Sequence, residues 1–214
     1  MKNKDLTGFR KEYAMASLDT NKVPADPILL FDRWLDEAIQ HALPEPNAMT
    51  LATITAEGRP AARVILLKEI DRGRFVFYTN YNSQKGLDLQ NNPQAALVFL
   101  WLELQRQVRV SGRVEKVSSA TSDAYFASRP RQSQIGAAIS PQSQPIESRN
   151  ILDQAFEHMQ ARTKEQAIKR PTHWGGYHLI PDRIEFWQGR KNRLHDRILY
   201  TLEKPSWKIQ RLAP

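Results

Sequence analysis

Residues 49–79, MTLATITAEGRPAARVILLKEIDRGRFVFYT, decide the fold of this chain. Three runs rich in apolar and β-branched residues read as strands: 49–55, 62–68 and 74–79. Gly58 and Gly73 mark the short turns between them. Because strands joined by short turns pair antiparallel, we expect an antiparallel sheet at the centre of the protein.

The rest of the chain extends this pattern. Residues 95–102 and 107–117 are also strand-like, and strands return from Trp174 to the closing WKIQRLAP. Asp26 and Pro27 begin a helix whose apolar residues recur at helical spacing up to Ile39. Further helices are predicted at 83–91, with Ser83 as N-cap, at 118–128 and at 147–168. The proline-, serine- and glutamine-rich segment 129–146 is predicted to be a functional loop.

These elements predict a mainly β fold with flanking helices (α+β), in which the antiparallel sheet closes or nearly closes as a barrel. A length of 214 residues favours a single domain. We place that domain at residues 26–214 and expect residues 1–25 to form a flexible arm.

Lysine and arginine outnumber aspartate and glutamate by 31 to 23, so an anionic partner is expected. The cations are scattered, and no nucleic-acid-binding motif is present, which favours a phosphorylated small molecule over nucleic acid. The chain has no cysteine, which excludes disulfides and thiolate metal sites. No apolar run has membrane-spanning length and MKNKDLTGFRKEY is unlike a secretory signal, so a soluble, cytoplasmic protein is expected.

Several common sites are absent from the sequence. It contains no phosphate-binding P-loop, no G-x-G-x-x-G turn, no G-x-S-x-G elbow and no H-E-x-x-H helix. Its five histidines are dispersed, so no metal site is expected.

Three groups of residues are suited to phosphate instead. Arg63 and Lys68 bracket an apolar strand, although their spacing puts them on opposite faces of a regular strand, which requires a twist, a bulge or two adjoining ligands. Tyr78, Thr79, Ser83 and Lys85 form a second group near a helix N-terminus. Tyr125 and Arg129 share a helix face, with Ser133 beyond Pro130.

Each group also has an explanation that needs no ligand. The first can be two cations that extend from the strand ends into solvent, the second a simple helix cap, and the third a polar cluster on the surface. Gln107, Gln142 and Ser143 add neutral groups of the kind that bind the edge of a heteroaromatic ring, and such residues are equally common on polar surfaces.

Residues 174–197, WGGYHLIPDRIEFWQGRKNRLHDR, are the most chemically dense stretch. If its end is extended, Arg193, His195 and Arg197 share one face, and Leu194 lies on the other. A solvated edge strand would look similar. The nearby Trp187 and Gly189 favour a binding surface, because they offer a flat apolar ring and a place for close backbone approach.

A series of motifs stands in order between about Arg10 and Pro214: RVILLK, FYTN followed by S-x-K, RQVRVSG, YFASRPRQSQIGA, SPQSQPI, WGGY, EFWQG, NRLHDR and QRLAP. Together these motifs give the chain a resemblance to the pyridoxamine 5′-phosphate oxidase family. It implies an FMN-binding split barrel, with FMN held between the two subunits of a homodimer.

The matching positions imply two sets of site residues. The implied FMN site comprises Arg63, Val64, Ile65, Leu66, Leu67, Lys68, Tyr78, Thr79, Gln84, Lys85, Gln107, Gln142, Ser143, Trp187 and Arg197. The implied substrate site comprises Arg10, Tyr13, Lys68, Tyr125, Arg129, Ser133, Arg193, Leu194 and His195. Arg193 and His195 are the implied catalytic residues, over the pyridine ring, whereas Arg10 and Tyr13 are implied to cover the substrate.

The implied reaction is the oxidation of pyridoxamine 5′-phosphate and pyridoxine 5′-phosphate to pyridoxal 5′-phosphate. A hydride equivalent passes from substrate C4′ to FMN, and dioxygen reoxidises FMN with release of hydrogen peroxide. The chain departs from the family at Ser83-Gln84-Lys85, where Ser-Arg-Lys is frequent, so weaker FMN binding is expected. The alternatives are another flavin-binding split-barrel oxidoreductase and, more remotely, a basic nucleic-acid-binding barrel.

Overall fold

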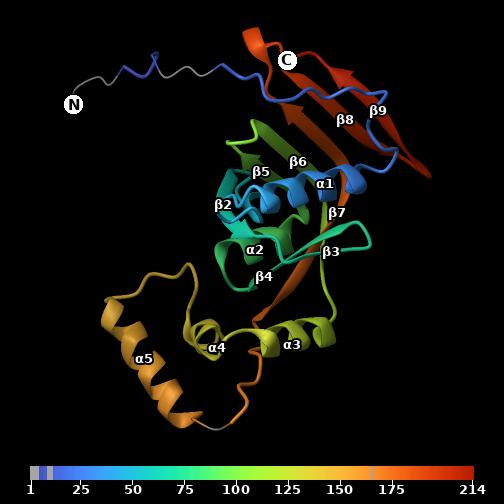
Figure 1. Ribbon diagram of the computed structural model, residues 1–214. Helices are drawn as coiled ribbons and strands as arrows, with labels where there is room; N and C mark the ends of the chain where they lie inside the picture. The colour runs from blue at the N-terminus through green and yellow to red at the C-terminus, as the bar shows by residue number, and fades with distance from the viewer. Residues whose placement is uncertain (1–4, 9–11, 165) are drawn as a thin grey trace. The chain divides into compact units, whose positions relative to one another are not determined.

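The computed structural model describes residues 5–8, 12–164 and 166–214 (Figure 1). The chain divides into two compact units. We call Met1–Asn47, Val98–Val110 and Asp182–Pro214 unit 1, and Ala48–Leu97 and Ser111–Pro181 unit 2. Strands β5 (Gln94–Trp101), β6 (Arg106–Lys116) and β7 (Trp174–Gln188) contribute residues to both.

The strands join in the order β2-β1-β5-β6-β7-β4-β3, with β8 paired to β7 and β9 to β8. The pairs β1–β2, β3–β4, β4–β7, β7–β8 and β8–β9 are antiparallel. This arrangement, with its helices, confirms the predicted antiparallel fold class.

Unit 2 begins with the two hairpins that the opening residues predict. The first joins β1 (Ala48–Ile54) to β2 (Pro60–Leu66), and the second joins β3 (Glu69–Asp71) to β4 (Arg74–Asn80). Gly58 and Gly73 have φ values of 75° and 78°, which glycine adopts without strain, so both turn predictions are confirmed. On β1, Met49, Leu51 and Thr53 are buried alternately, as expected for a half-buried strand.

The helices of unit 2 are α2 (Gln84–Asn91), α3 (Ser119–Ser128), α4 (Arg131–Ile139) and α5 (Arg149–Arg162). Helices α4 and α5 pack side by side (Figure 1). A small core forms where Phe126 and Ile135 meet Ile168 and Trp174. Phe156 and Met159 of α5 pack against this core from outside.

In unit 1, helix α1 (Pro27–Gln40) starts where predicted, because the Asp26 side chain accepts a hydrogen bond from the Ile28 N–H. Phe31 of α1 packs edge-on to Phe99, with ring centroids 4.9 Å apart, and Trp34 packs edge-on to Phe186 at 5.2 Å. Strands β8 (Asp196–Glu203) and β9 (Ser206–Leu212) form a hairpin.

The N-terminal segment of unit 1 is bonded to these strands. The Leu18 N–H donates to Asp196 Oδ2 over 3.0 Å, and the Tyr200 hydroxyl donates to the Pro24 carbonyl over 2.8 Å. Part of the predicted arm, residues 12–25, is therefore fixed by specific contacts, whereas residues 1–4 and 9–11 lie outside the described residues.

Two predicted elements were wrong in detail. The predicted loop 129–146 contains α4, which starts after Pro130 and buries Ile135. Helix α5 ends at Arg162 rather than at residue 168, and no residue of it is fully buried, so its apolar stripe is only partly covered. The prediction of Ser83 as the N-cap of α2 is confirmed, although its hydroxyl donates to the Asn80 carbonyl and accepts no hydrogen bond from a backbone N–H of the helix.

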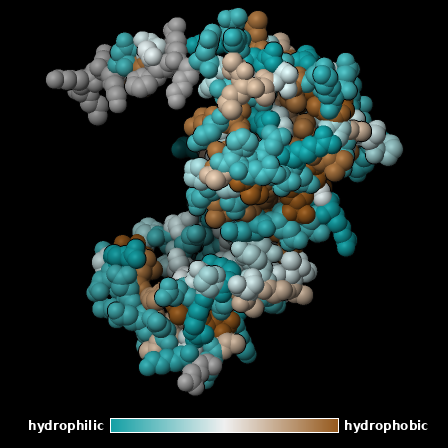
Figure 2. All heavy atoms as spheres, in the orientation of Figure 1, coloured by the Kyte–Doolittle hydropathy of each residue, from teal (hydrophilic) through white to brown (hydrophobic). Residues whose placement is uncertain are grey.

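Within the described residues, no helix is both long and apolar enough to cross a membrane. Figure 2 shows hydrophobic residues reaching the surface among hydrophilic ones on this face. The exposed hydrophobic residues include Val64 on β2 and Leu100 on β5.

Candidate functional site

Unit 2 contains a cavity of about 1010 Å³. Its walls come from β2, β4, α2, α3, α4 and the start of β7, and from the loop that follows α4. The sequence-predicted residues that line it are Arg63, Val64, Ile65, Leu66, Lys68, Tyr78, Thr79, Gln84, Lys85, Tyr125, Arg129, Ser133, Gln142 and Ser143. All three phosphate-suited groups of the sequence thus contribute residues to one space, although Ser83 of the second group does not line it. Leu67, also predicted, is buried in the core instead.

Arg63 is held by a polar network at one side of the cavity. Its Nη1 donates to Thr53 Oγ1 over 2.6 Å, and its Nη2 lies 3.5 Å from Asp88 Oδ2. Asp88 is buried and also accepts hydrogen bonds from Thr53 Oγ1 at 2.6 Å and from Gln84 Nε2 at 2.8 Å. The guanidinium is therefore oriented by partners on three elements, β1, β2 and α2.

Lys85 lies beside this network and is itself buried. Its ammonium donates to Ser83 Oγ at 2.9 Å, to Thr79 Oγ1 at 3.0 Å and to Gln142 Oε1 at 3.1 Å. All three acceptors are neutral. Burial and the nearby Arg63 lower the pKa of Lys85 to about 8, whereas Asp88 acts in the opposite direction and raises it. An anion in the cavity would compensate this buried cation.

The spacing of Arg63 and Lys68 is explained by where β2 ends. The strand stops at Leu66, so Lys68 lies beyond the regular alternation of side chains, and both cations border the same cavity. The opposite-face argument applied to a regular strand over residues 62–68, whereas β2 ends before it reaches Lys68. The exposed Lys68 forms no hydrogen bond or ion pair within the described residues other than the one that its backbone N–H donates to the Val76 carbonyl.

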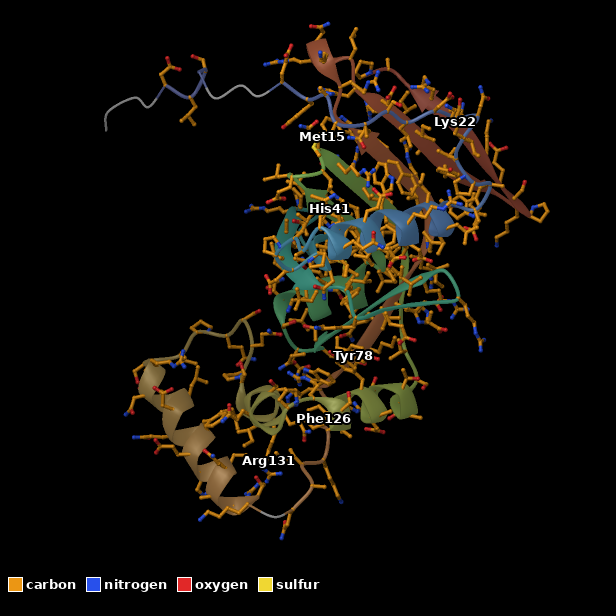
Figure 3. All side chains as sticks on the ribbon, viewed as in Figure 1. Met15, Lys22, His41, Tyr78, Phe126 and Arg131 are labelled. Carbon is orange, nitrogen blue, oxygen red and sulfur yellow. The ribbon has the colours of Figure 1, made fainter. Side chains whose placement is uncertain are left out.

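Aromatic rings form another part of the cavity wall. The rings of Tyr78 and Tyr125 stack with centroids 3.8 Å apart, and Trp174 lies parallel to both, 5.6 Å from Tyr78 and 6.2 Å from Tyr125. Figure 3 labels Tyr78 on β4 and Phe126 on α3, which both contact Trp174. Burial raises the pKa of Tyr78 to about 12 and also raises that of Tyr125, so both phenols stay protonated and can donate.

Arg129 follows α3 and lies over this aromatic wall. Its guanidinium carbon is 4.6 Å from the centroid of the Trp174 ring, which is a cation–π arrangement. Its Nη1 is buried and has no hydrogen-bond partner among the described residues. Burial lowers the pKa of Arg129, partly offset by Tyr125. A buried, unpartnered donor on a cavity wall is suited to an anionic ligand.

Sequence reasoning missed several lining residues: Asn80, Pro130, Gly136, Ala137, Ser140 and Trp174. Trp174 stands at the start of the dense 174–197 stretch, but its role depends on Tyr125 and Arg129, which are about fifty residues away in the chain. Asp88 was also missed. It lies four residues after Gln84, a helical spacing that brings the two side chains together.

The remaining predicted residues belong to unit 1. Tyr13, Gln107 and Trp187 line a smaller cavity of about 210 Å³. The Trp187 ring is 4.6 Å from the His195 ring, and the Tyr13 ring is 6.0 Å from each of them. Gly189 permits this cluster, since a Cβ there would lie 2.8 Å from Tyr13 Cγ. The close approach predicted at Gly189 is made by Tyr13.

His195 accepts a hydrogen bond at Nδ1 from the Arg190 N–H over 3.1 Å. This contact leaves the proton of a neutral ring on Nε2. Burial and the nearby Arg193 lower the pKa of His195, which favours the neutral ring at pH 7. His195 is thereby prepared to donate one hydrogen bond from Nε2.

Residues 193–197 are not one extended strand, so that expectation was wrong. Lys191–Arg193 form a 3₁₀ turn, Arg193 has a φ of 60°, and β8 begins only at Asp196. Arg193 and Leu194 are exposed, and Leu194 lines a third hollow, of about 510 Å³. Arg197 pairs with Trp187 across β7 and β8, and its Nε donates to Glu185 Oε1 over 2.8 Å. Arg10 lies outside the described residues.

The unit 2 cavity fits a ligand with a phosphate and a flat ring. Lys85 and Arg63 supply cationic donors, Thr79 and Ser143 supply hydroxyls, and the amide of Gln142 adds a neutral group. Within the described residues, no group of three histidine or carboxylate side chains is placed to hold a metal ion.

The sequence of this chain is similar to proteins of known family over most of its length. Residues 35–163 match the family described as pyridoxamine 5′-phosphate oxidase, and residues 174–214 match the pyridoxine 5′-phosphate oxidase C-terminal dimerisation region. The chain is 54% identical over 213 residues to the pyridoxine/pyridoxamine 5′-phosphate oxidase of Trichormus variabilis, covering 99% of this chain and 100% of the relative. It is also 54% identical to the enzyme of the same description from Cupriavidus pinatubonensis, covering 98% and 99%.

Two solved structures share the fold. PhzG from Burkholderia lata 383, in complex with tetrahydrophenazine-1-carboxylic acid, has a TM-score of 0.88 at 30% identity, covering 94% of this chain and 100% of that one. An FMN-binding protein from Nostoc punctiforme, described as related to pyridoxamine 5′-phosphate oxidase, has a TM-score of 0.71 at 18% identity, covering 90% and 98%. The second likeness is a likeness of fold alone.

Proposed function

Because the chain belongs to the pyridoxamine 5′-phosphate oxidase family, we propose that it binds FMN and oxidises pyridoxamine 5′-phosphate and pyridoxine 5′-phosphate to pyridoxal 5′-phosphate. Dioxygen is the proposed electron acceptor and hydrogen peroxide the second product. The single observation that carries the proposal is the unit 2 cavity, in which two separate sets of anion-binding side chains face one space. Two phosphorylated ligands, cofactor and substrate, need two such sets.

The first set is assigned to the phosphate of FMN. Lys85 and the oriented guanidinium of Arg63 supply the charge, while Thr79 and Ser143 supply hydroxyl groups. Gln84 stands where the family resemblance implies arginine, and its amide already donates to Asp88. Its contribution to phosphate binding is therefore small, and this chain is expected to hold FMN less tightly than a relative with arginine there.

The second set is assigned to the phosphate of the substrate. Arg129 offers its unpartnered Nη1, Tyr125 a protonated phenol and Ser133 a hydroxyl. The exposed ammonium of Lys68 borders the same cavity and adds a further positive charge. These donors hold the vitamin by its phosphate and leave its ring free to meet the flavin.

The chemistry that bound FMN would supply is acceptance of a hydride equivalent from substrate C4′ and transfer of the electrons to dioxygen. The side chains of the protein orient the substrate and supply charged groups and hydrogen-bond donors to it. His195 offers the Nε2 proton of a neutral imidazole to the substrate, and Arg193 a guanidinium for its ring. Trp187 and Gln107 are assigned to the flavin ring, and Arg10 and Tyr13 to a cover over the substrate. Arg197, bonded to Glu185, is assigned to FMN.

The chain carries the family's dimerisation region at residues 174–214, which supports a homodimer. We propose that FMN lies at the interface of that dimer, with Trp187, Arg193, His195 and Arg197 completing the site. The proposed dimer is tested by the mass of the FMN-loaded protein in solution, since a strictly monomeric loaded form would contradict a shared site.

An oxidase assay tests the proposed function. Purified protein should show the visible absorption of a flavin, release FMN on denaturation, and form peroxide with both pyridoxamine and pyridoxine 5′-phosphates. Unphosphorylated pyridoxamine is the control, and it should react poorly because the Arg129 set has no phosphate to bind. Flavin-loaded protein without this activity would favour another flavin oxidoreductase. Colourless protein with salt-dependent binding to oligonucleotides would favour a nucleic-acid-binding barrel.

A further inference from the structure

The network around Arg63 contains a buried carboxylate, which is unexpected beside a site assigned to phosphate. Asp88 is 1% exposed and lies next to Arg63 and Lys85, the two cations of the FMN phosphate set. A negative charge there repels an incoming anion, and burying it is costly unless it is well bonded. A role for the carboxylate must outweigh both costs.

The bonding of Asp88 shows what it can do. Its Oδ1 accepts from Gln84 Nε2 at 2.8 Å, and its Oδ2 accepts from Thr53 Oγ1 at 2.6 Å while facing Arg63 Nη2 at 3.5 Å. Both carboxylate oxygens are thus fixed, and a neutral asparagine would replace one of these acceptors with a donor.

The guanidinium of Arg63 is fixed on two sides by this arrangement. Thr53 Oγ1 accepts from Nη1 at 2.6 Å, and the carbonyls of Leu51 and Ala61 lie 3.4 Å from the same nitrogen. Asp88 fixes the second nitrogen, Nη2, from the direction of α2. Thr53 and Asp88 also bond to each other, so one strand and one helix together define the plane of the guanidinium.

We propose that Asp88 is a positioning residue for the FMN phosphate: with Thr53 it holds the guanidinium of Arg63 in the plane in which its remaining N–H groups face the phosphate. The inference rests on the proposed function and deepens it. The carboxylate of Asp88 also acts on Lys85. It favours the charged form of the Lys85 ammonium, which binds an anion, whereas the nearby Arg63 disfavours that form.

A positioning role and simple charge repulsion by Asp88 predict opposite changes in the Kd for FMN when the carboxylate is removed. Removing a negative charge from an anion site should tighten binding if Asp88 only repels the phosphate. If it positions Arg63, Asp88→Asn should raise the Kd for FMN about tenfold or more, because a charge-assisted contact is lost. Riboflavin has the same ring without the phosphate, so its Kd should not change.

The experiment titrates flavin-free protein with FMN and with riboflavin, following flavin fluorescence, with thermal unfolding measured for every variant. Asp71→Asn is the matched control, because it removes an exposed carboxylate on β3, and it should leave the FMN Kd unchanged within about twofold. If Asp88→Asn does not fold, Thr53→Val and Thr53→Ser replace it, and only the valine variant should lose FMN affinity.

The outcomes separate the two claims. Absence of FMN binding by the unmodified chain would overturn the proposed function. Normal binding by the unmodified chain, with equal or tighter FMN binding by Asp88→Asn, would overturn the positioning role. Equal loss of FMN and riboflavin affinity would also overturn it, because that pattern indicates general damage to the cavity.

Discussion

The guanidinium carbon of Arg129 lies 4.6 Å from the centroid of the Trp174 ring, and Arg129 Nη1 is buried without a hydrogen-bond partner in the described part of the chain. The aromatic ring supports a cation that forms no ion pair with any carboxylate among the described residues. This arrangement keeps the positive charge available to a ligand while limiting the cost of burying it.

Replacing Arg129 by methionine should raise the KM for pyridoxamine 5′-phosphate about 10- to 150-fold, because a charged hydrogen bond contributes roughly 1.5–3 kcal/mol. FMN affinity should stay unchanged, since the flavin set does not include Arg129. Steady-state kinetics and an FMN titration measure the two effects. Arg149→Met removes an exposed arginine on α5 and is the control. A normal KM in Arg129→Met would remove this residue from the substrate site.

Trp174→Phe tests the support beneath Arg129. The smaller ring weakens the cation–π contact and the parallel packing with Tyr125, so KM should rise about 2- to 30-fold, which corresponds to roughly 0.5–2 kcal/mol. The effect on kcat should be small, because Trp174 is not assigned to the reacting atoms. Ile135→Val, a variant of the same core that removes no aromatic ring, separates this effect from loose packing. A fall in kcat alone would contradict the positioning of the substrate phosphate by Trp174.

Gln84→Arg should tighten FMN binding about tenfold or more by adding a cation to the phosphate set. The new guanidinium lies one helical turn from Asp88, whose carboxylate helps to hold it over the cavity. Gln90→Arg places the same charge at an exposed position of the same helix, and it should change the Kd much less. If both variants bind FMN more tightly to a similar degree, the net charge of the helix and not the position of the arginine controls the affinity for FMN.

The affinity for FMN should fall as the pH rises above about 8. Lys85 has a pKa lowered to about 8 by burial and by Arg63, so its ammonium is charged below this pH and increasingly neutral above it. Since phosphate binds the charged form, binding raises this pKa and takes up a proton at pH values above about 8. Calorimetric titration in buffers of different ionisation enthalpy measures the uptake. In Lys85→Arg the charge persists, so the fall should disappear; an unchanged profile would contradict the assignment to Lys85.

Gly189→Ala should release Tyr13 from its position, because the added Cβ would lie 2.8–2.9 Å from atoms of the tyrosine side chain. Faster proteolytic cleavage within residues 12–17 is the expected result. Gly136→Ala is the control, since a Cβ there meets nothing within 4 Å and alanine favours the helix. Equal cleavage of Gly189→Ala and the unmodified protein would show that this segment does not depend on the contact.

The sequence by itself determined the local structure, because the signals are short-range. Alternating apolar residues with Gly58 and Gly73 predicted the two hairpins, and Asp26 with Pro27 predicted the start of α1. The cations that border the cavity were also identified from their neighbours in the chain. Such features depend on residues within a few positions of one another, and therefore on information that a single segment contains.

Only the tertiary structure decided which of these groups share a space. Lys68 borders the same cavity as Arg63 because β2 ends at Leu66, a limit set by pairing with β1. Arg129 rests on Trp174, and Asp88 bonds to Thr53, through contacts between segments 35 or more residues apart. Periodicity shows which side chains share a face of an element, but not what that face meets. The packing of distant elements settles that, and with it the burial that gives Lys85 and Arg129 their chemistry.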